Sequence, residues 1–422
     1  MAGMRTPALL ASCLVIAACG GDSSNPSASG DSGPPQYVVT EWVLPSSPGS
    51  AQPNLVATDD GRLLLTWINS TAGRRNALRF AALGENGRWS SEARTVVVGD
   101  ALMANWADVP HITAAADGAL WVHWLQKAGG DGYAADIALS RSVDGGFNWA
   151  APVKVNDDEV VAEHGFAALW PTGPESVGIA WLDGRNNVAP ADHEMAHGRT
   201  ELRAAVFDRN FARSAEAVVD PMTCDCCQTD LAITAKGPLL VYRDRTDEEI
   251  RDIVAVRLQD GAWTAPNPVH ADNWHMTACP VNGPSVAADG NDVVAAWYTA
   301  ADDKPRVLLS RSGDAGDSWG APVMLDEGGA VQGRVAVALD DDQAWALWVR
   351  EDKTGQSLWL SRRSADLAKE LQRLQVAKLE GRGKATGFPQ LALHHGNAYL
   401  VWTDIVDRAP HLRGAIVALP EG

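Results

Sequence analysis

An apolar run that ends in an aromatic residue recurs along the chain at intervals of about 55 residues. The terminal aromatic residues of these runs are Trp67, Trp124, Trp181, Tyr242, Trp297, Trp348 and Trp402. A second short apolar segment precedes most copies across a polar turn, as in PHITAAADG at residues 110–118. Two short apolar segments joined by turn residues are typical of paired antiparallel strands, so each copy predicts a β-hairpin.

A third apolar segment follows each hairpin, and a fourth follows in most copies. Four strands in this length correspond to one propeller blade, so the chain is predicted to be an all-β propeller of four-stranded antiparallel blades. Seven copies favour seven blades, and six would result if one copy is degenerate. The seventh copy lacks a fourth strand, which the segment 37–44 (YVVTEWVL) can supply. Such pairing of the chain ends closes the ring and leaves no exposed sheet edge at the join.

Two turns between third and fourth strands share the pattern S-x-D-x-G-x-x-W. Their residues are Ser142, Asp144, Gly146 and Trp149 in one turn, and Ser312, Asp314, Gly316 and Trp319 in the other. The carboxylate can accept backbone N–H bonds, glycine allows positive φ, and tryptophan can pack between blades. On these turns the sequence resembles the bacterial Asp-box (BNR-repeat) propellers of the sialidase-like group, from about residue 37 to the end. The resemblance implies a fold and little about chemistry.

The N-terminus has the layout of a secretory signal. Arg5 gives it a basic start, and an apolar run over about residues 8–18 is too short to span a bilayer. Residues 16–19 (IAAC) resemble the bacterial lipobox, which implies cleavage before Cys19 and a lipid on its sulfur; an ordinary signal cleaved near Cys19 is the alternative. The small and polar residues that follow are expected to form a flexible tether.

These features divide the chain into a lipoprotein signal peptide (1–18), a lipid-anchored tether (19–36) and a single propeller domain (37–422). The expected location is the bacterial cell envelope, on the periplasmic or surface side of a membrane that holds the lipid on Cys19. The chain carries 53 acidic and 35 basic residues, a formal net charge of −18. Such a charge repels phosphate backbones, so no nucleic-acid partner is expected.

The candidate site lies on one face of the predicted ring. The first strand of each blade lines the central channel, so the segments that lead into first strands share a face with the loops that leave second strands. Polar residues concentrate on this face in the third to fifth repeats. The candidate ligand-binding residues are Glu163, His164, Asp183, Arg185, Arg243, Asp244, Arg245, Arg251 and Asn282, together with Arg334 of the sixth repeat.

The arginines among them allow two interpretations. Their forked donors could bind a carboxylate, sulfate or phosphate group of a ligand. Alternatively, they could pair with nearby carboxylates in a structural network at the rim. The carboxylates in question are Asp183, Asp244, Glu249 and Asp252.

Four cysteines lie in segments that lead into two neighbouring blades: Cys224, Cys226 and Cys227 before the fourth, and Cys279 before the fifth. In an oxidising compartment they are interpreted first as disulfides, with one bridge from Cys279 to the cluster and a vicinal bridge between Cys226 and Cys227 as an option for the other pair.

The alternative is a soft-metal site, because thiolates suit copper(I) or zinc. Further ligands could come from Met222, His275 and Met276, and the segment 193–197 (HEMAH) is a weaker hint. The C-x-C-C motif lacks the paired C-x₂-C spacing of structural zinc sites.

The sialidase comparison does not supply catalytic residues. Sialidases use an arginine triad, a tyrosine nucleophile with a glutamate partner, and an aspartate acid/base, and their first arginine lies in an Arg-Ile-Pro motif. The corresponding stretch here, residues 51–55 (AQPNL), contains no arginine. Tyr242 occupies the recurring aromatic position, which favours a core or channel-wall role over a nucleophile.

Three functions follow from the sequence. The favoured one is a binding lipoprotein whose channel face holds an anionic ligand, a metal or a partner, such as an acidic glycan or an envelope protein. The second is an exo-sialidase-like glycoside hydrolase acting on acidic sugars, which needs a pair of carboxylates facing a pocket. The candidates for that pair are Glu163, Asp183, Asp225 and Asp244. The third is copper or zinc handling through the cysteines. The missing Arg-Ile-Pro motif favours binding over catalysis.

Overall fold

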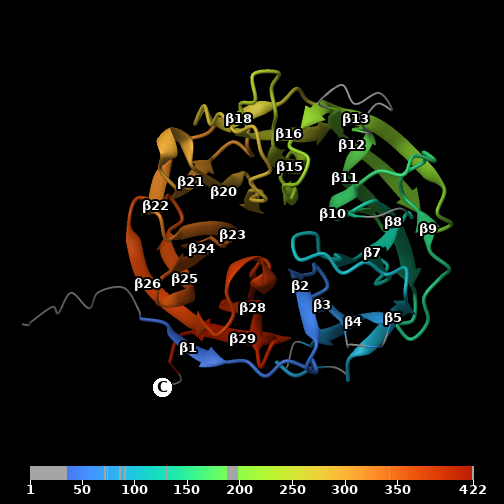
Figure 1. The fold of residues 1–422 in the computed structure, drawn as a ribbon, viewed down its shortest axis with the longest axis horizontal. Coiled ribbons are helices and arrows are strands. Elements are labelled where there is room, and N and C mark those ends of the chain that lie inside the picture. The colour runs from blue at the N-terminus through green and yellow to red at the C-terminus, as the bar shows by residue number, and fades with distance from the viewer. Residues whose placement is uncertain are drawn as a thin grey trace, which may run out of the picture. The chain divides into compact units, whose positions relative to one another are not determined.

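The computed structural model describes residues 36–420 except residues 71–72, 74, 85–86, 90–91, 130–131, 188–197 and 342. In this part of the chain seven antiparallel sheets are arranged in a ring around a central axis (Figure 1). The prediction of an all-β propeller with seven blades is confirmed. The predicted signal peptide, the lipidation site at Cys19, residues 19–35 of the tether and the segment 193–197 lie outside the described residues.

The blades follow one another along the chain. Blade 1 contains β2 (Ser50–Ala57), β3 (Leu63–Asn69), β4 (Asn76–Leu83) and β5 (Arg94–Gly99). Blade 2 contains β6 (Ile112–Ala114), β7 (Leu120–Lys127), β8 (Ala135–Ser142) and β9 (Val153–Lys154). Blade 3 contains β10 (His164–Gly173), β11 (Ser176–Asn186), β12 (Arg199–Asp208) and β13 (Arg213–Thr223).

The fourth blade departs slightly from the pattern, because two short strands share the outer position. Blade 4 contains β14 (Asp230–Thr234), β15 (Gly237–Arg243) and β16 (Ile253–Gln259), and β17 (Ala262–Trp263) and β18 (Asn267–His270) both pair with β16. Blade 5 contains β19 (Ser285–Asp289), β20 (Asp292–Thr299), β21 (Arg306–Ser312) and β22 (Val323–Glu327), with the 3-10 helix η1 (Ala301–Asp303) after β20.

Blade 6 contains β23 (Val331–Leu339), β24 (Gln343–Asp352), β25 (Gly355–Ser364) and β26 (Glu370–Leu379). The 3-10 helix η2 (Gly383–Thr386) leads into blade 7, which contains β27 (Gln390–His394), β28 (Asn397–Val406) and β29 (Ala409–Ala418). Its outer strand is β1 (Val38–Glu41), from the other end of the described chain.

The ring closes through this pairing of its two ends. β1 is antiparallel to β29, with Val38 opposite Ala418 and Glu41 opposite Ala415. In Figure 1 the blue β1 lies beside the red β29. The predicted closure by the N-terminal strand is therefore confirmed.

The recurring aromatic residues lie in the second strand of each blade and are buried, Trp67, Trp181, Trp297 and Trp348 at 1% exposure or less. A second strand has neighbours on both edges, and the adjacent blades cover both of its faces. The apolar clusters accordingly cross blade boundaries, as where Trp348 of blade 6 shares a cluster with Val294 of blade 5. Burial of each large apolar side chain contributes roughly 1.5–3 kcal/mol, so packing between blades holds the ring together.

The first S-x-D-x-G-x-x-W turn joins blades 1 and 2. Asn148 N donates to Asp144 Oδ1 over 2.9 Å, and Gly146 N donates to Ser142 Oγ over 2.9 Å. Gly146 has a φ of 86°, and a Cβ at this position would lie 2.1 Å from Cζ of Phe80 in blade 1. Trp149 packs edge-on against the same ring. Glycine is required here by both backbone conformation and close packing.

The second turn repeats this geometry between blades 5 and 4. Gly316 N donates to Ser312 Oγ over 2.7 Å, and Ser318 N donates to Asp314 Oδ1 over 2.9 Å. A Cβ on Gly316 would lie 2.6 Å from a methyl of Leu239 in blade 4. Both turns connect third and fourth strands, so they lie on the ring face away from the segments that lead into first strands.

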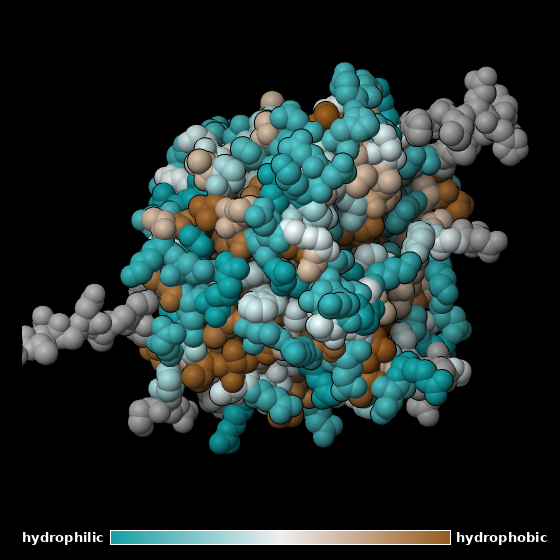
Figure 2. All heavy atoms as spheres, turned by 60° about the vertical axis from the view of Figure 1, so that its left-hand side comes forward, coloured by the Kyte–Doolittle hydropathy of each residue, from teal (hydrophilic) through white to brown (hydrophobic). Residues whose placement is uncertain are grey.

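The outer side of the ring is mainly hydrophilic where it can be seen. Figure 2 turns the side that carries β22 and β26 forward and shows smaller hydrophobic areas between polar residues. No residue of β26 is fully buried, and exposed residues recur between partly buried ones, as expected for an outermost strand. No helix among the described residues is long and apolar enough to cross a membrane.

Candidate functional site at the channel mouth

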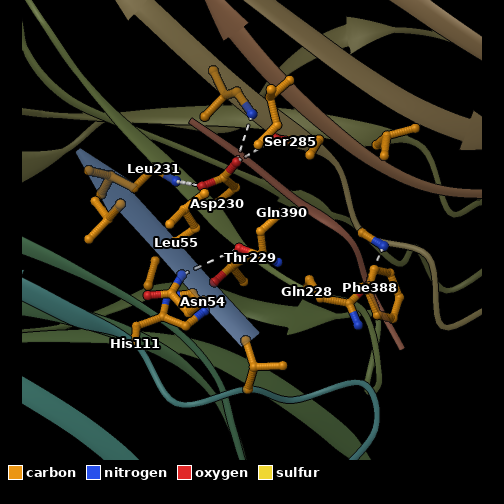
Figure 3. A pocket seen from close by; sticks show the side chains of 18 of the residues that line it. Asn54, Leu55, His111, Gln228, Thr229, Asp230, Leu231, Ser285, Phe388 and Gln390 are labelled. Atoms are coloured by element: carbon orange, nitrogen blue, oxygen red, sulfur yellow. Dashed lines mark hydrogen bonds between the residues drawn. The ribbon is translucent and has the colours of Figure 1, made fainter. Parts of the chain in front are cut away.

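The central channel contains a cavity of about 250 Å³ between the first strands of the blades (Figure 3). Its polar side chains bond across blades. Asp230 of β14 accepts hydrogen bonds from Ser285 Oγ over 2.9 Å and from Val286 N over 2.8 Å, both in blade 5. Burial raises the pKa of Asp230 to about 6. Gln228 accepts from Gly283 N and donates to Ala107 O. These groups connect blades within the channel wall.

Aromatic side chains lie where the first strands begin. Trp106, before β6, stacks on Phe388, before β27, with 5.9 Å between ring centroids. The guanidinium of Arg334 lies 5.4 Å from the Trp106 ring. Cys226 and Val281 pack against the same apolar cluster. We call this region, together with the neighbouring cysteine segments, the channel mouth.

The four predicted cysteines meet at the channel mouth. The sulfurs of Cys224 and Cys227 are 3.0 Å apart, and the sulfurs of Cys224, Cys226 and Cys227 all lie within 4.8 Å of one another. Cys279 comes from the segment before blade 5, and its thiol lies beside that of Cys226. Cys224 and Cys227 are buried, Cys226 is partly buried and Cys279 is exposed.

The hydrogen-bonded pair, Cys224 and Cys227, differs from the vicinal pair considered from the sequence. Residues 224–227 form a turn, which brings the side chains three positions apart together. Cys224 and Cys227 thus have a C-x₂-C spacing inside the C-x-C-C motif, and the sulfur of Cys226 is left near Cys279.

Charged groups surround the thiols. Arg251 Nη1 lies 3.4 Å from Cys224 Sγ, and its Nη2 donates to Glu249 over 2.8 Å. Burial alone would raise the pKa of Cys224. Hydrogen bonds from the thiols of Cys226 and Cys227, followed by the charge of Arg243, more than offset this and hold the pKa well below its usual value.

Three carboxylates lie beside the cysteine turn: Asp225 is part of the turn, Glu163 interacts with Asp225, and Asp108 interacts with Glu163. Burial, and then the charge of Asp225, raise the pKa of Glu163 to about 7. Burial also raises the pKa of Asp225, which pairs with Arg245 at 3.3 Å. Asp108 accepts a hydrogen bond from Phe166 N, and burial raises its pKa to about 7. Asp108 was not among the predicted residues; its only sequence signal is its place just before the first strand of blade 2.

The buried arginines donate to the protein itself. Arg243 donates to Asn282 O through Nε and Nη2, to Arg251 O through Nη1 over 2.6 Å, and to Tyr298 O through Nη2 over 2.7 Å. Arg334 Nη1 donates to three acceptors in the segment before blade 7, which are Gly383 O, Thr386 Oγ1 and Gly387 O. Asn282 accepts from Arg334 N over 2.8 Å. These contacts tie blades 4 to 7 together at the mouth.

A separate ion network lies at blade 3. His164 Nε2 is 3.2 Å from Asp158 and 3.6 Å from Asp183, and its Nδ1 is hydrogen-bonded to Ala135 O. Burial alone would lower the pKa of His164, but the hydrogen bond and charge of Asp183 outweigh it and raise the pKa. Arg185 bonds Asp183 over 2.7 Å and reaches Asp158. This guanidinium already neutralises the carboxylates that could otherwise hold a cation with His164.

No model of a known protein family matches the sequence, and no curated protein matches it. Among solved structures, the chain is similar to a polysaccharide lyase described as an ulvan lyase, with 11% identity, a TM-score of 0.45, and 78% of this chain and 79% of that chain covered. It is similar to the NanB sialidase of Streptococcus pneumoniae, with 11% identity, a TM-score of 0.45, and coverage of 92% and 71%. An α-L-arabinofuranosidase of Fusarium graminearum has 12% identity, a TM-score of 0.47, and coverage of 92% and 98%. These are likenesses of fold alone.

The remaining predicted residues occupy structural or peripheral places. Tyr242 donates its hydroxyl to buried Asp220 over 2.5 Å, which suits the predicted core role. Asp244 accepts from Arg245 N, and burial raises its pKa to about 6. His275 is exposed, and its ring is not part of the group formed by the three clustered sulfurs. Met276 is partly buried beside it and bonds Glu249 O through its backbone.

Proposed function

We propose that this protein is an exported lipoprotein of the bacterial cell envelope whose propeller binds a thiophilic metal ion, copper(I) or zinc, at the channel mouth. The observation that carries the proposal is the convergence of the thiols of Cys224, Cys226 and Cys227 within 4.8 Å, with Cys279 beside Cys226. Export and lipidation are inferred from the signal-like N-terminus and residues 16–19.

The donor set fits a soft cation. Thiolates are preferred ligands of copper(I) and zinc, and the sulfurs of Cys224, Cys226 and Cys227 offer a trigonal site. Asp225 lies next to Cys224 and interacts with Glu163, and the raised pKa values of the two carboxyl groups reflect burial and like charge. A cation at the mouth would relieve that repulsion.

An anionic ligand is less well supported. Arg243 and Arg334 are buried and donate to carbonyl groups of the protein, and Arg245 bonds Glu249 over 2.6 Å. The guanidinium donors that could hold a carboxylate, sulfate or phosphate group are therefore engaged internally. Binding an anion would require these bonds to break, at a cost of about 1–3 kcal/mol for each buried group left unpaired.

The test uses the full-length lipoprotein, purified anaerobically in detergent and kept reduced. We expect about one metal ion per chain by elemental analysis, and copper(I) retention against a competing chelator. C224S and C227S should lose the metal, because they remove buried ligands, whereas H275A should keep it, because the exposed imidazole lies outside the cluster. Metal retained by both serine variants, or reduced wild-type protein that binds neither ion, would contradict the proposal.

A second candidate is a glycoside hydrolase acting on acidic sugars. The specific observation is the half-buried pair of Glu163 and Asp225, in which Glu163 has a pKa of about 7 and Asp225 is paired with Arg245. A protonated and an ionised carboxyl group are the two groups that glycoside hydrolysis needs. Release of reducing sugar from acidic oligosaccharides, abolished in E163Q and D225N alike, would support it. Turnover unchanged in E163Q would exclude this pair.

A further inference from the structure

The four thiols form a chain of contacts from the interior of the channel mouth to its surface. Cys227 and Cys224 are buried, Cys226 is partly buried, and Cys279 is exposed. Each lies next to the following one: Cys227 Sγ is 3.0 Å from Cys224 Sγ, the sulfurs of Cys224 and Cys226 are within 4.8 Å, and the thiol of Cys279 lies beside that of Cys226. The inner pair, Cys224 and Cys227, thus connects to the surface through the outer pair, Cys226 and Cys279.

We propose that the inner pair, Cys224 and Cys227, is a redox-active dithiol that exchanges electrons with external disulfides through the outer pair, Cys226 and Cys279. The relay does not require a metal. Its consequence for the site rests on the proposed function: oxidation of the inner pair removes two ligands, so the relay determines whether the metal can bind.

Two features of the mouth position the relay. A Cβ on Gly283 would lie 2.1 Å from Gln228 O, so glycine allows the segments that carry Cys226 and Cys279 to approach. Arg243 joins the same two segments, because its guanidinium donates to Asn282 O and its carbonyl accepts from Cys224 N. The outer sulfurs are therefore held together by packing and hydrogen bonds of their own segments.

A guanidinium assists the buried sulfur. Arg251 Nη1 is 3.4 Å from Cys224 Sγ, and Arg251 is held by Glu249 and by its backbone bond to Trp274 O. A positive donor beside a cysteine stabilises the thiolate, which is the attacking and the leaving form in thiol–disulfide exchange. Cys224 is consequently suited to pass the disulfide from Cys226 to Cys227.

The exchange balances in four displacements. The Cys279 thiolate attacks an external disulfide and releases one external thiolate, and Cys226 then attacks the Cys279 sulfur and releases the second. Cys224 attacks the Cys226 sulfur and breaks the outer disulfide, which frees Cys279. Cys227 attacks the Cys224 sulfur and frees Cys226. The inner dithiol has then lost two electrons and two protons, and the external disulfide has become two thiols.

The test follows disulfide formation in metal-free, full-length protein mixed with oxidised glutathione, by differential alkylation and mass spectrometry. We expect a Cys224–Cys227 disulfide as the accumulating product in wild type. C279S should slow its formation at least about tenfold, because glutathione cannot reach the inner pair directly. C227S should accumulate a Cys224–Cys226 disulfide, and H275A should behave as wild type.

Two results would overturn the relay: an inner disulfide that forms as fast in C279S as in wild type, or a Cys226–Cys227 disulfide as the main product. Circular dichroism of C279S checks that the variant is folded, and C226S provides an independent block, because it should stop at glutathione on Cys279. Failure of the metal proposal is distinguishable, since the assay contains no metal. If the relay is found but no metal binds, the electron exchange is supported and only the proposed control of metal binding is contradicted.

Discussion

Arg243 provides the sharpest test of how the channel mouth is held together. Its side chain is 1% exposed and donates to the carbonyl groups of Asn282, Arg251 and Tyr298 over 2.6–3.0 Å. The guanidinium also lies 4.9 Å from the ring of Trp274. Replacement by methionine keeps much of the volume and removes every donor.

The expected cost follows from the acceptors left behind. Three carbonyl groups lose their charged donor, those of buried Asn282 and Arg251 and of partly buried Tyr298, and each buried group left unsatisfied costs about 1–3 kcal/mol. Allowing for partial relaxation, R243M should lower the free energy of unfolding by about 3–6 kcal/mol. R243K should recover only part of this loss, because one ammonium group cannot reproduce a planar fork of donors.

Urea unfolding followed by tryptophan fluorescence measures this change, because tryptophans are distributed through the blades. R199M is the matched control, since Arg199 is 55% exposed and pairs with an exposed aspartate, so its removal should leave the unfolding midpoint nearly unchanged. R243M within about 0.5 kcal/mol of wild type would refute the structural role. If such a stable variant also lost binding of an anion, the ligand-binding interpretation of Arg243 would be correct.

Two further predictions concern the turns and the ion network of blade 3. G146A should destabilise the domain by about 2–4 kcal/mol in the same unfolding assay, since it combines strain at positive φ with a clash against Phe80. G118A, at a similar φ with nothing within 4 Å of the added Cβ, should cost only about 1 kcal/mol, and equal losses in the two variants would contradict the packing argument. His164 has a raised pKa in the folded protein, so its contribution to stability is present below its unfolded pKa and is lost as pH rises through the folded one. The stability difference between wild type and H164N should therefore shrink from pH 5.5 to pH 9, and a difference independent of pH would show that His164 is not held as an imidazolium.

The fold could be predicted from local patterns along the chain. The period of the aromatic runs, from Trp67 to Trp402, reflects the second strand of each blade, where neighbours on both edges and both faces exclude water. Turn glycines such as Gly146 are required by backbone conformation, so they also leave a local signal. The closure by β1 followed from counting strands, because an unpaired edge is unfavourable.

The site depended on contacts that the sequence does not record. The arginines could have faced a ligand or the protein, and only the positions of segments that lead into the blades place Arg243 against Asn282 O and Arg185 against Asp158. The two alternatives use the same residue types, so composition could not separate them. Asp108 was missed because its importance comes from the distant Phe166 and Glu163.

For the cysteines too, the sequence determined one part of the site and the tertiary structure decided the other. Their number and their places before two neighbouring blades could be found in the sequence, and blade order alone brings the two segments to the same side of the ring. The turn at residues 224–227 and the missing side chain of Gly283 then decide that Cys224 meets Cys227 and that Cys226 meets Cys279. Sulfur contacts depend on distances of a few ångströms between segments, and tertiary packing sets such distances.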